Sequence, residues 1–275
     1  MKNISVLLFL LITLALNAQN NKTSGLNARQ FHKYWKVESE SPDYKVTFLG
    51  DTVEILSPKG LTLWRKEKMS GKVTIEYDAC VVVEVEGDRL SDLNCFWMAS
   101  DPQYPDNIWK REKWRSGIFL NCYSLQLYYM GYGGNHNSTT RFRRYDGNEA
   151  AITNAKARPA ILKEYTDADH LLEANKWYHI KITNENNRVS YYINGVRLVD
   201  FRDAAPLTEG WFGFRTTLSR TRIANFHYEC SPQEISEIPL HWIGNTPQQD
   251  RTVSLGVPSV SYTHLRAHET DQYLV

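Results

Sequence analysis

The stretch YYMGYGGNHNSTTRFRRYDG, residues 128–147, gathers the side chains of this sequence that are best suited to ligand chemistry. It contains one histidine, two asparagines, two threonines and three arginines around a pair of glycines. Arginine binds carboxylates through two parallel hydrogen bonds, tyrosine offers a flat apolar ring with a polar end, and a loop histidine titrates near neutral pH. This combination indicates a site for an acidic sugar such as a uronate.

The stretch is expected to form a β-hairpin, because side chains of a strand alternate between its two faces. One face of the first strand is expected to be exposed to solvent, where its side chains can stack on sugar rings. This face comprises Gln126, Tyr128, Met130 and Tyr132. The opposite face, expected in the protein interior, comprises Leu125, Leu127, Tyr129 and Gly131. On the returning strand, one face comprises Thr139, Arg141, Arg143 and Tyr145, and the other comprises Thr140, Phe142 and Arg144. Two arginines and a tyrosine are therefore predicted to share one sheet surface.

An ordinary structural role for these arginines is the alternative. They would then pair with carboxylates of neighbouring strands, such as Glu76, Asp78, Glu84 and Glu86. Surface ion pairs of this kind are common and contribute little. The site interpretation is favoured because like charges that alternate along one strand repel each other unless an anion meets them.

Other candidates lie in loops or strands that are expected near the same surface. His136 follows two glycines between Asn135 and Asn137, where a ligand can reach an imidazole. The further candidates for substrate binding are Asn135, Trp97, Arg115 and Arg215. Packing in the core or at a rim is the alternative for each of them, and a solvated or turn-capping role is the alternative for His136.

The elements that must position these residues are short runs rich in Val, Ile, Tyr, Phe and Trp, bounded by Gly, Asn, Asp and Pro, a pattern typical of an all-β sandwich. The expected strands span residues 45–49, 52–56, 72–85, 95–99, 117–120, 124–132, 139–145, 177–184, 188–193, 196–200, 210–216 and 223–229. Asn194 and Gly195 join two of them through the residue pair that favours a type I′ hairpin turn. Helix is expected to be minor, near residues 27–35 or 168–173.

Composition narrows the class of partner. The 32 Lys and Arg nearly balance the 31 Asp and Glu, which gives no global field for nucleic acid. The chain is rich in aromatic residues, with 16 Tyr and 8 Trp, as expected for faces that contact sugars, although packing in a sandwich core is the commoner explanation. The four cysteines lie too far apart for a zinc site, and their spacing leaves disulfides open.

Both ends of the chain differ from its body. Residues 1–18 have the pattern of a secretory signal peptide with an apolar run too short to span a bilayer, so we expect a secreted or periplasmic monomer without a membrane span. Residues 19–240 are assigned to the β-sandwich domain and residues 241–258 to a truncated C-terminal extension. Residues 259–275 back-translate to a sequencing adapter and are interpreted as read-through rather than native protein.

Three segments carry a resemblance to a known superfamily. WYHIKI, YINGV and GWFGFR, followed by IANFHY, resemble the final strands of concanavalin A-like sandwiches, which include lectins, glucanases and laminin-G domains. The resemblance implies an antiparallel jelly-roll β-sandwich. Within this superfamily, the residues 131–145 resemble a secreted bacterial family of polysaccharide-utilisation systems that is catalogued only as a domain of unknown function. The implied partner is a polysaccharide or oligosaccharide.

The resemblance leaves the activity open among three classes. Related retaining glucanases carry a Glu-x-Asp-x-x-Glu strand, whose last Glu is missing after Glu76 and Asp78 here. β-sandwich lyases use Arg with Asn or Gln, His and Tyr. The lyase hypothesis is favoured. In it, the carboxylate is held by Arg141 and Arg143 together with Asn137 or Gln126. His136 removes the proton, and Tyr132 or Tyr145 protonates the leaving group.

A binding module without catalysis is the second class, with the same tyrosines and Trp97 stacked on sugars. Hydrolysis by Asp101 or Asp106 with Glu112 is the third. No cofactor is expected. Residues 100–107 are acidic enough to host a structural calcium ion and equally resemble a proline-stiffened turn, so no metal is assigned.

Overall fold

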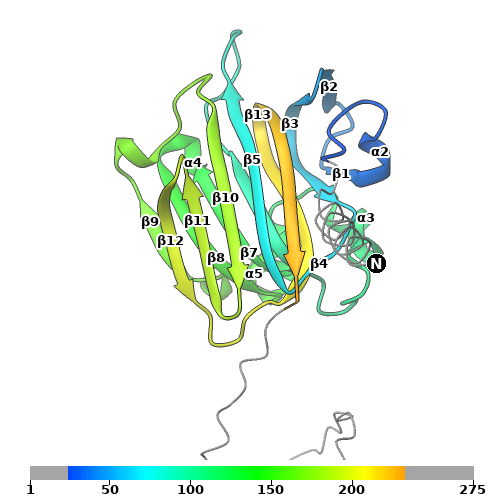
Figure 1. The fold of residues 1–275 in the computed structure, drawn as a ribbon, viewed down its shortest axis with the longest axis vertical. Helices are drawn as coiled ribbons and strands as arrows, with labels where there is room; N and C mark the ends of the chain where they lie inside the picture. The colour runs from blue at the N-terminus through cyan, green and yellow to red at the C-terminus, as the bar shows by residue number, and fades with distance from the viewer. Residues whose placement is uncertain (1–23, 233–275) are drawn as a thin grey trace, which may run out of the picture. The chain divides into compact units, whose positions relative to one another are not determined.

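Residues 24–232 are the part of the chain that the computed structural model describes, and they form an antiparallel β structure (Figure 1). Its strands are β1 (Trp35–Ser39), β2 (Lys45–Leu49), β3 (Thr52–Arg65), β4 (Met69–Ser70), β5 (Lys72–Val82), β6 (Asn94–Ser100), β7 (Gln126–Gly133), β8 (Thr139–Asp146), β9 (Lys163–Tyr165), β10 (Tyr178–Glu185), β11 (Arg188–Ile193), β12 (Val196–Arg202) and β13 (Glu209–Ser231). The helices are single turns: α2 (Phe31–Tyr34), η1 (Ile108–Arg111), α3 (Glu112–Arg115), η2 (Leu120–Ser124), α4 (Gly134–Asn137), α5 (Ala150–Thr153), η3 (Ala155–Ala157) and η4 (Ala168–His170). The predicted all-β class with minor helix is confirmed.

Two sheets face each other, and the long strand β13 takes part in both. Its C-terminal half pairs with β5, which is followed by β10, β11 and β12, and we call this layer the β10 sheet. Its N-terminal half pairs with β6, which is followed by β7, β8 and β9, and we call this layer the β7 sheet. β3 accompanies β13 through both sheets. In Figure 1, β5, β10, β11 and β12 lie in front of β7 and β8.

A bulge allows β13 to pass from one sheet to the other. The register with β3 shifts between Thr217 and Ser219, and Leu218 has a positive φ of 50°. Bulges bend a strand and increase its twist. The sequence predicted two strands over residues 210–216 and 223–229, and the structure joins them into one bent strand.

The main hydrophobic core lies between the two sheets. The β7 sheet contributes Trp97, Tyr128 and Phe142, and the β10 sheet contributes Tyr191. The ring of Trp97 stacks on those of Phe142 and Tyr191, with centroids 6.0 and 6.3 Å apart. Offset aromatic pairs of this kind add to the stabilisation from burial, so the abundance of aromatic residues is explained largely by this core.

A second apolar layer covers the opposite face of the β7 sheet. Phe96, Leu127, Tyr129 and Tyr145 pack there beneath residues 108–124 and α5. The strand β7 is consequently buried on both of its faces from Leu127 onward. Residues 108–124 therefore determine how much of this face a ligand can reach.

Two local predictions have different outcomes. The hairpin at Asn194 and Gly195 is confirmed, since both residues have positive φ, 50° and 81°, and join β11 to β12. The strand predicted over residues 117–120 is wrong, because Gly117 is in a turn with φ 68° and η2 follows.

Several predictions concern parts of the chain outside the described residues. The signal peptide of residues 1–18, the extension of residues 241–258 and the adapter-derived segment of residues 259–275 all lie there. Between residues 24 and 232, the structure has no helix that is long and apolar enough to cross a membrane.

Candidate functional site

A cavity of about 340 Å³ opens on the face of the β7 sheet that carries the second apolar layer. Its volume falls within the range of about 300–1,000 Å³ that is typical of small-ligand sites. Its lining combines arginines, tyrosines, carboxylates and amides: Glu40, Asp92, Asn94, Phe119, Tyr123, Tyr129, Gly131, Gly134, Asn135, Thr139, Arg141, Arg143, Tyr145, Arg215 and Thr217. We call this cavity the arginine pocket.

The strand β8 contributes four residues to the pocket through simple alternation. Thr139, Arg141, Arg143 and Tyr145 all line the cavity, whereas Phe142 points into the core between the sheets. The sequence-based prediction for the faces of this strand is therefore confirmed.

The faces of β7 are the reverse of the prediction. Tyr128 and Tyr132 lie in the sandwich core, where the Tyr128 hydroxyl donates to Asp203 Oδ2 at 2.6 Å and the Tyr132 hydroxyl donates to the Leu171 carbonyl at 3.2 Å. Tyr129 and Gly131 line the pocket instead. The expected stacking surface of Tyr128 and a catalytic role for Tyr132 are thus contradicted, because both side chains lie in the core and not in the pocket lining.

Gly131 makes room for the ring of Tyr129. A Cβ atom at position 131 would lie 2.5 Å from the Tyr129 hydroxyl and 2.9 Å from its Cζ. The ring therefore extends along its own strand over the glycine. Cross-strand pairing places Arg143 opposite Tyr129 and Arg141 opposite Gly131. The phenol of Tyr129 consequently lines the pocket beside β8, the strand that carries Arg141 and Arg143.

The three arginines of the pocket differ in their partners. Arg141 forms an ion pair with Glu164 of β9 at 2.5 Å. Arg143 donates to the Pro159 carbonyl, and Arg215 donates to the Gly117 carbonyl at 2.6 Å and to Thr62 Oγ1 at 3.3 Å. Neither Arg143 nor Arg215 has a carboxylate within ion-pair distance among residues 24–232. Arg215 is only 2% exposed, and its guanidinium and the Glu40 carboxylate approach the same glycine, since a Cβ atom at Gly60 would lie 2.5 Å from Arg215 Nη2 and 3.1 Å from Glu40 Oε2.

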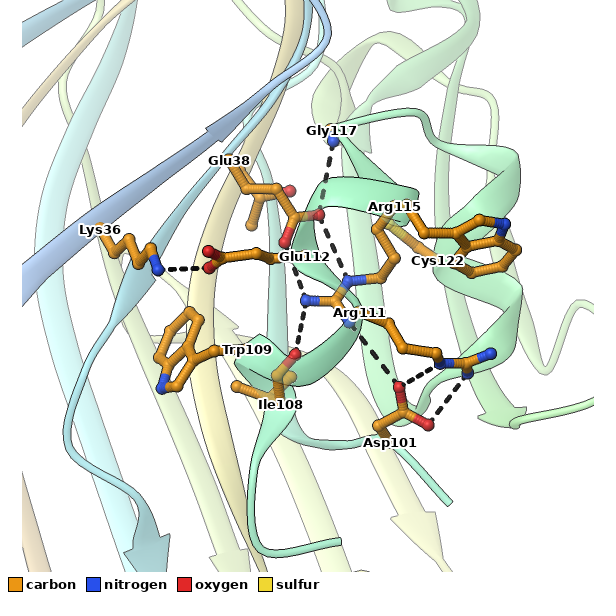
Figure 2. Close-up of polar contacts among 12 residues, drawn as sticks. Lys36, Glu38, Asp101, Ile108, Trp109, Arg111, Glu112, Arg115, Gly117 and Cys122 are labelled. Carbon is orange, nitrogen blue, oxygen red and sulfur yellow. Dashed lines mark hydrogen bonds and ion pairs between the residues drawn. The ribbon is translucent and has the colours of Figure 1, made fainter. Parts of the chain in front are cut away.

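A cluster of buried ion pairs lies beside the pocket and holds residues 108–124 in place (Figure 2). Arg115 is fully buried and donates to Glu38 Oε2 at 2.8 Å and to the Ile108 carbonyl at 2.8 Å, and its second terminal nitrogen lies 3.8 Å from Asp101. Glu38 also accepts a hydrogen bond from the Gly117 amide at 3.4 Å. Gly117 thereby connects this ion-pair cluster to Arg215, because its carbonyl accepts from that guanidinium.

Two polar groups of the pocket lining are buried and lack partners in the described structure: Asn94 Oδ1 and the Tyr145 hydroxyl. The Asn94 amide nitrogen donates to Asp92 Oδ1 at 3.1 Å. Tyr145 is fully buried, and this burial raises the pKa of its phenol well above 10.0. Unpaired buried polar groups are rare in proteins, and a bound ligand is one way to satisfy them. Sequence reasoning identified Tyr145 but missed Asp92 and Asn94, whose only signal is the Asp-x-Asn spacing ahead of β6.

The turn α4 places only part of its polar sequence at the pocket. Asn135 lines the cavity, but His136 is exposed at the turn and is not in the lining. Asn137 is tied to the backbone of Leu172 by hydrogen bonds of 2.9 and 2.8 Å. Asn135, His136 and Asn137 all have positive φ, between 54° and 59°, so the turn is left-handed. The pocket geometry therefore gives no support to His136 as the base or to Asn137 as a carboxylate ligand.

Three other candidates also lie outside the pocket. Trp97 is fully buried in the sandwich core rather than at a rim, because its strand face packs against the β10 sheet. Arg115 is buried in the ion-pair cluster and is no rim residue. Gln126 pairs with Asp146 at the far end of β7 and does not line the cavity. The candidates that the structure brings together are Asn135, Arg141, Arg143, Tyr145 and Arg215.

The acidic residues considered for hydrolysis or calcium are mostly engaged elsewhere. Asp101 is fully buried and pairs with Arg111 at 2.7 Å, and Glu112 pairs with Lys36. Asp106 is almost fully exposed. None of the three lines the pocket. Within the described range, no group of three or more His, Cys, Asp or Glu residues could hold a metal ion.

Cys80, Cys95 and Cys122 are buried free thiols, and burial raises the pKa of Cys122 to about 11.

The two-sheet architecture and the pocket on its outer layer define a concanavalin A-like β-sandwich domain. The chain belongs to the family described as Domain of unknown function (DUF6250), which matches residues 55–226, more than half of the sequence. The resemblance to a family catalogued only in this way is confirmed. No curated protein matches the chain.

Solved structures share the fold at low sequence identity. A protein of unknown function with a galectin-like fold from Bacillus subtilis is 14% identical, with a TM-score of 0.61 over 78% of this chain and 97% of that chain. The exoplasmic/lumenal domain of VIP36, in a form bound to Ca²⁺ and Man3GlcNAc, is 8% identical, with a TM-score of 0.52 over 80% and 93%. The carbohydrate recognition domain of Emp47p is 12% identical, with a TM-score of 0.50 over 78% and 98%. These similarities establish the fold.

Proposed function

We propose that this protein is a secreted carbohydrate-active protein that binds uronate-containing polysaccharides in the arginine pocket. The observation that carries the proposal is the buried guanidinium of Arg215, which is 2% exposed and bonded only to the neutral oxygens of Gly117 and Thr62. A buried cation without a carboxylate at ion-pair distance is costly. A ligand carboxylate supplies the missing charge, and the half-buried Arg143 supplies a second set of donors.

The neighbouring aromatic side chains support a sugar as the bearer of the carboxylate. Tyr129 lies in the pocket floor, and Phe119 and Tyr123 contribute from residues 108–124. Sugar rings present apolar faces edged by hydroxyls, which suit tyrosine. The structural neighbours include a carbohydrate recognition domain and a domain solved with an oligosaccharide, which makes a saccharide ligand a natural use of this fold.

We further propose that the bound uronate undergoes β-elimination. Arg143 and Arg215 would neutralise the carboxylate and stabilise the negative charge that develops after proton removal. Tyr145 is the acid of this proposal, because it lines the pocket with a hydroxyl that has no partner among residues 24–232, and burial keeps this hydroxyl protonated by raising its pKa well above 10.0. Glu40 is the base of this proposal, since it lines the pocket and has no ion-pair partner within residues 24–232.

The electrons and protons of this step balance without a co-reactant. Glu40 takes the proton from the carbon next to the carboxylate, the electron pair of that bond forms a carbon–carbon double bond, and the glycosidic bond to the neighbouring carbon breaks. The leaving oxygen receives the Tyr145 proton. Arginine, tyrosine and a carboxylate are thus sufficient, and His136 is not required.

A binding module without catalysis is the competing function, and turnover separates the two. The full chain should be incubated with a panel of acidic and neutral polysaccharides, with binding, ultraviolet absorbance of an unsaturated product, and new reducing ends as readouts. We expect binding and absorbance with an acidic polysaccharide. Binding without either product overturns the elimination step, reducing ends without absorbance indicate hydrolysis, and failure to bind any acidic polysaccharide overturns the proposed function.

Matched variants make this experiment specific to the pocket. Tyr145→Phe and Glu40→Gln should abolish the absorbance and retain binding, whereas Arg143→Met should abolish binding. Arg188→Met is the control, because Arg188 is an exposed arginine of the β10 sheet that pairs with Asp200 at 2.6 Å. Equal loss of binding in Arg188→Met would point to nonspecific electrostatic attraction instead of the pocket.

A further inference from the structure

Asn94 lies in the pocket beside Arg215, and its amide is held in one orientation. The two residues are cross-strand neighbours on β6 and β13. The Asn94 amide nitrogen donates to Asp92 Oδ1 at 3.1 Å. Because an ionised carboxylate can only accept hydrogen bonds, the amide nitrogen must face Asp92 and the amide oxygen must face away from it.

Asp92 is itself fixed by other groups, so the orientation of Asn94 is built into the fold. Ser91 Oγ donates to Asp92 Oδ2 at 2.8 Å, and Arg89 forms an ion pair with the same carboxylate. Asp92 is 7% exposed. Its backbone has a φ of 66°, and its amide donates to the Gly133 carbonyl at 3.1 Å. The carboxylate is therefore anchored on several sides and is not available to turn with a ligand.

The Asn94 amide oxygen is left as an acceptor without a donor. It has no hydrogen-bond partner in the described part of the chain, and the residue is only 7% exposed. A buried acceptor without a partner destabilises the folded state. The neighbouring Arg215 offers only donors. The pocket floor thus presents donors for an anion next to an acceptor for a hydroxyl or N–H group.

We propose that Asn94 is a specificity-determining residue, which accepts a hydrogen bond from a sugar hydroxyl while Arg215 and Arg143 bind the carboxylate of the same ligand. This inference rests on the proposed function and names the ligand more closely: a sugar acid with a free hydroxyl near its carboxylate. The acid group itself offers only acceptors, so the donor to Asn94 must be a hydroxyl of the same sugar. Asp92 is a positioning residue that acts through Asn94.

The experiment combines changes in the ligand with changes in the protein. The probes are methyl glucuronide and methyl galacturonide, each compared with its 2-, 3- and 4-deoxy derivatives by calorimetry on the full chain. We expect the unaltered protein to bind one deoxy derivative about tenfold more weakly than its parent, as the loss of one hydrogen bond to a buried acceptor predicts. Asn94→Ala should bind that parent about tenfold more weakly and should no longer distinguish it from the deoxy derivative.

Asn184→Ala is the matched control. Asn184 is 1% exposed, donates its amide nitrogen to the Leu207 carbonyl at 3.1 Å and also has an amide oxygen without a partner, but it does not line the pocket. This variant should prefer the parent uronide over its deoxy derivative to the same extent as the unaltered protein does. Asp92→Asn should weaken the preference for the parent uronide over its deoxy derivative without removing it. The new side-chain amide at position 92 can donate as well as accept, so it no longer fixes the orientation of the Asn94 amide.

The two proposals fail in different ways. If Asn94→Ala still prefers the parent uronide over every deoxy derivative to the same extent, the role of Asn94 is overturned and uronate binding stands. If the unaltered protein binds neither uronide, the proposed function is overturned together with this inference.

Discussion

The ion-pair cluster around Arg115 and the arginine pocket lie side by side, yet they treat a buried guanidinium in opposite ways. Arg115 and Arg215 are 0% and 2% exposed. Arg115 has Glu38 at 2.8 Å and Asp101 at 3.8 Å, whereas Arg215 has only neutral oxygens from Gly117 and Thr62. The cluster thus supplies its guanidinium with carboxylates of the chain, although Arg115 Nη1 has no hydrogen-bond partner among residues 24–232, whereas the pocket leaves Arg215 without a carboxylate at ion-pair distance.

The difference shows what each region does. Where no ligand reaches, as beneath residues 108–124, the chain supplies its own carboxylates and uses the ion pairs to hold a loop (Figure 2). In the pocket, Asn94 Oδ1 and the Tyr145 hydroxyl have no partner among residues 24–232, as the proposed binding of an outside molecule requires. The contrast between Arg115 and Arg215 can therefore be tested by measuring stability and ligand affinity separately.

The largest expected effect is on stability and comes from Arg115→Met. The substitution leaves Glu38 buried without its cation, and removing one member of a buried ion pair costs about 3–5 kcal/mol. The free energy of unfolding from urea denaturation measures this loss. Arg188→Met, which breaks an exposed pair, should change stability by less than about 1 kcal/mol. A loss below 1 kcal/mol for Arg115→Met would contradict the structural role of the cluster.

The next effect is on affinity and comes from Arg215→Met. We expect about a hundredfold weaker binding of an acidic oligosaccharide, in line with the loss of a desolvated charge partner. The free energy of unfolding without ligand should stay the same or rise, because methionine removes a buried cation that has no carboxylate at ion-pair distance. Calorimetric titration and urea denaturation of the same preparation give both quantities.

The comparison partner for this experiment is Arg222→Met. Arg222 pairs with Glu54 at 2.7 Å and with Glu84 at 3.1 Å, away from the pocket. Its loss should cost about 1–2 kcal/mol of stability and leave affinity unchanged. If Arg215→Met destabilises the protein as Arg222→Met does and keeps its affinity, Arg215 is structural and the contrast between the regions disappears.

A smaller effect is expected from Gly131→Ala. The new Cβ atom would lie 2.5 Å from the Tyr129 hydroxyl, so the ring must leave the pocket floor. We expect about tenfold weaker binding of the oligosaccharide and a stability loss of about 1–3 kcal/mol from overpacking. The double variant with Tyr129→Ala relieves the clash but also removes the packing of a buried ring, so the two stability losses should not add and the affinity should not recover. Recovery of the affinity would show that the ring of Tyr129 does not contact the ligand.

The sequence was sufficient for the fold and for one of the two strands of the site. The faces of β8 were predicted correctly because polar and apolar residues alternate there, with Phe142 inward and the arginines outward. The faces of β7 were assigned wrongly because that strand is buried on both sides. Tyr128 packs in the sandwich core, and Tyr129 packs under residues 108–124, so tyrosines occur on both faces and the alternation carries no information.

The parts of the site that come from distant segments could not be predicted from local pattern. Asn94 is a pocket residue only because β6 pairs with β13 and thereby lies next to Arg215. Arg115 was expected at a rim, but the carboxylate of Glu38 reaches it from β1, across 77 positions of sequence. Ion pairs and cross-strand neighbours of this kind depend on topology, which the spacing of residues does not encode.

The smallest effect on stability, and the one most specific to the pocket, is expected from Tyr145→Phe at neutral pH. The Tyr145 hydroxyl is buried without a partner, so its removal should change the free energy of unfolding by less than about 1 kcal/mol. Tyr128→Phe is the paired control, because the Tyr128 hydroxyl donates to Asp203 and accepts from the Leu207 amide at 3.1 Å, and its loss should cost about 1–3 kcal/mol.

Tyr145→Phe should also change how the stability depends on pH in alkaline solution. Burial raises the pKa of the Tyr145 phenol well above 10.0, so the folded chain keeps a proton that the unfolded chain loses above about pH 10. The stability that this proton contributes is complete below pH 10 and declines as the pH rises toward the folded pKa, by about 1.4 kcal/mol per pH unit. Tyr145→Phe should reduce the alkaline decline by that amount, as urea denaturation between neutral pH and pH 11 would show. An unchanged slope would mean that the phenol ionises in the folded pocket, which would contradict its role as the group that holds a proton for the leaving oxygen.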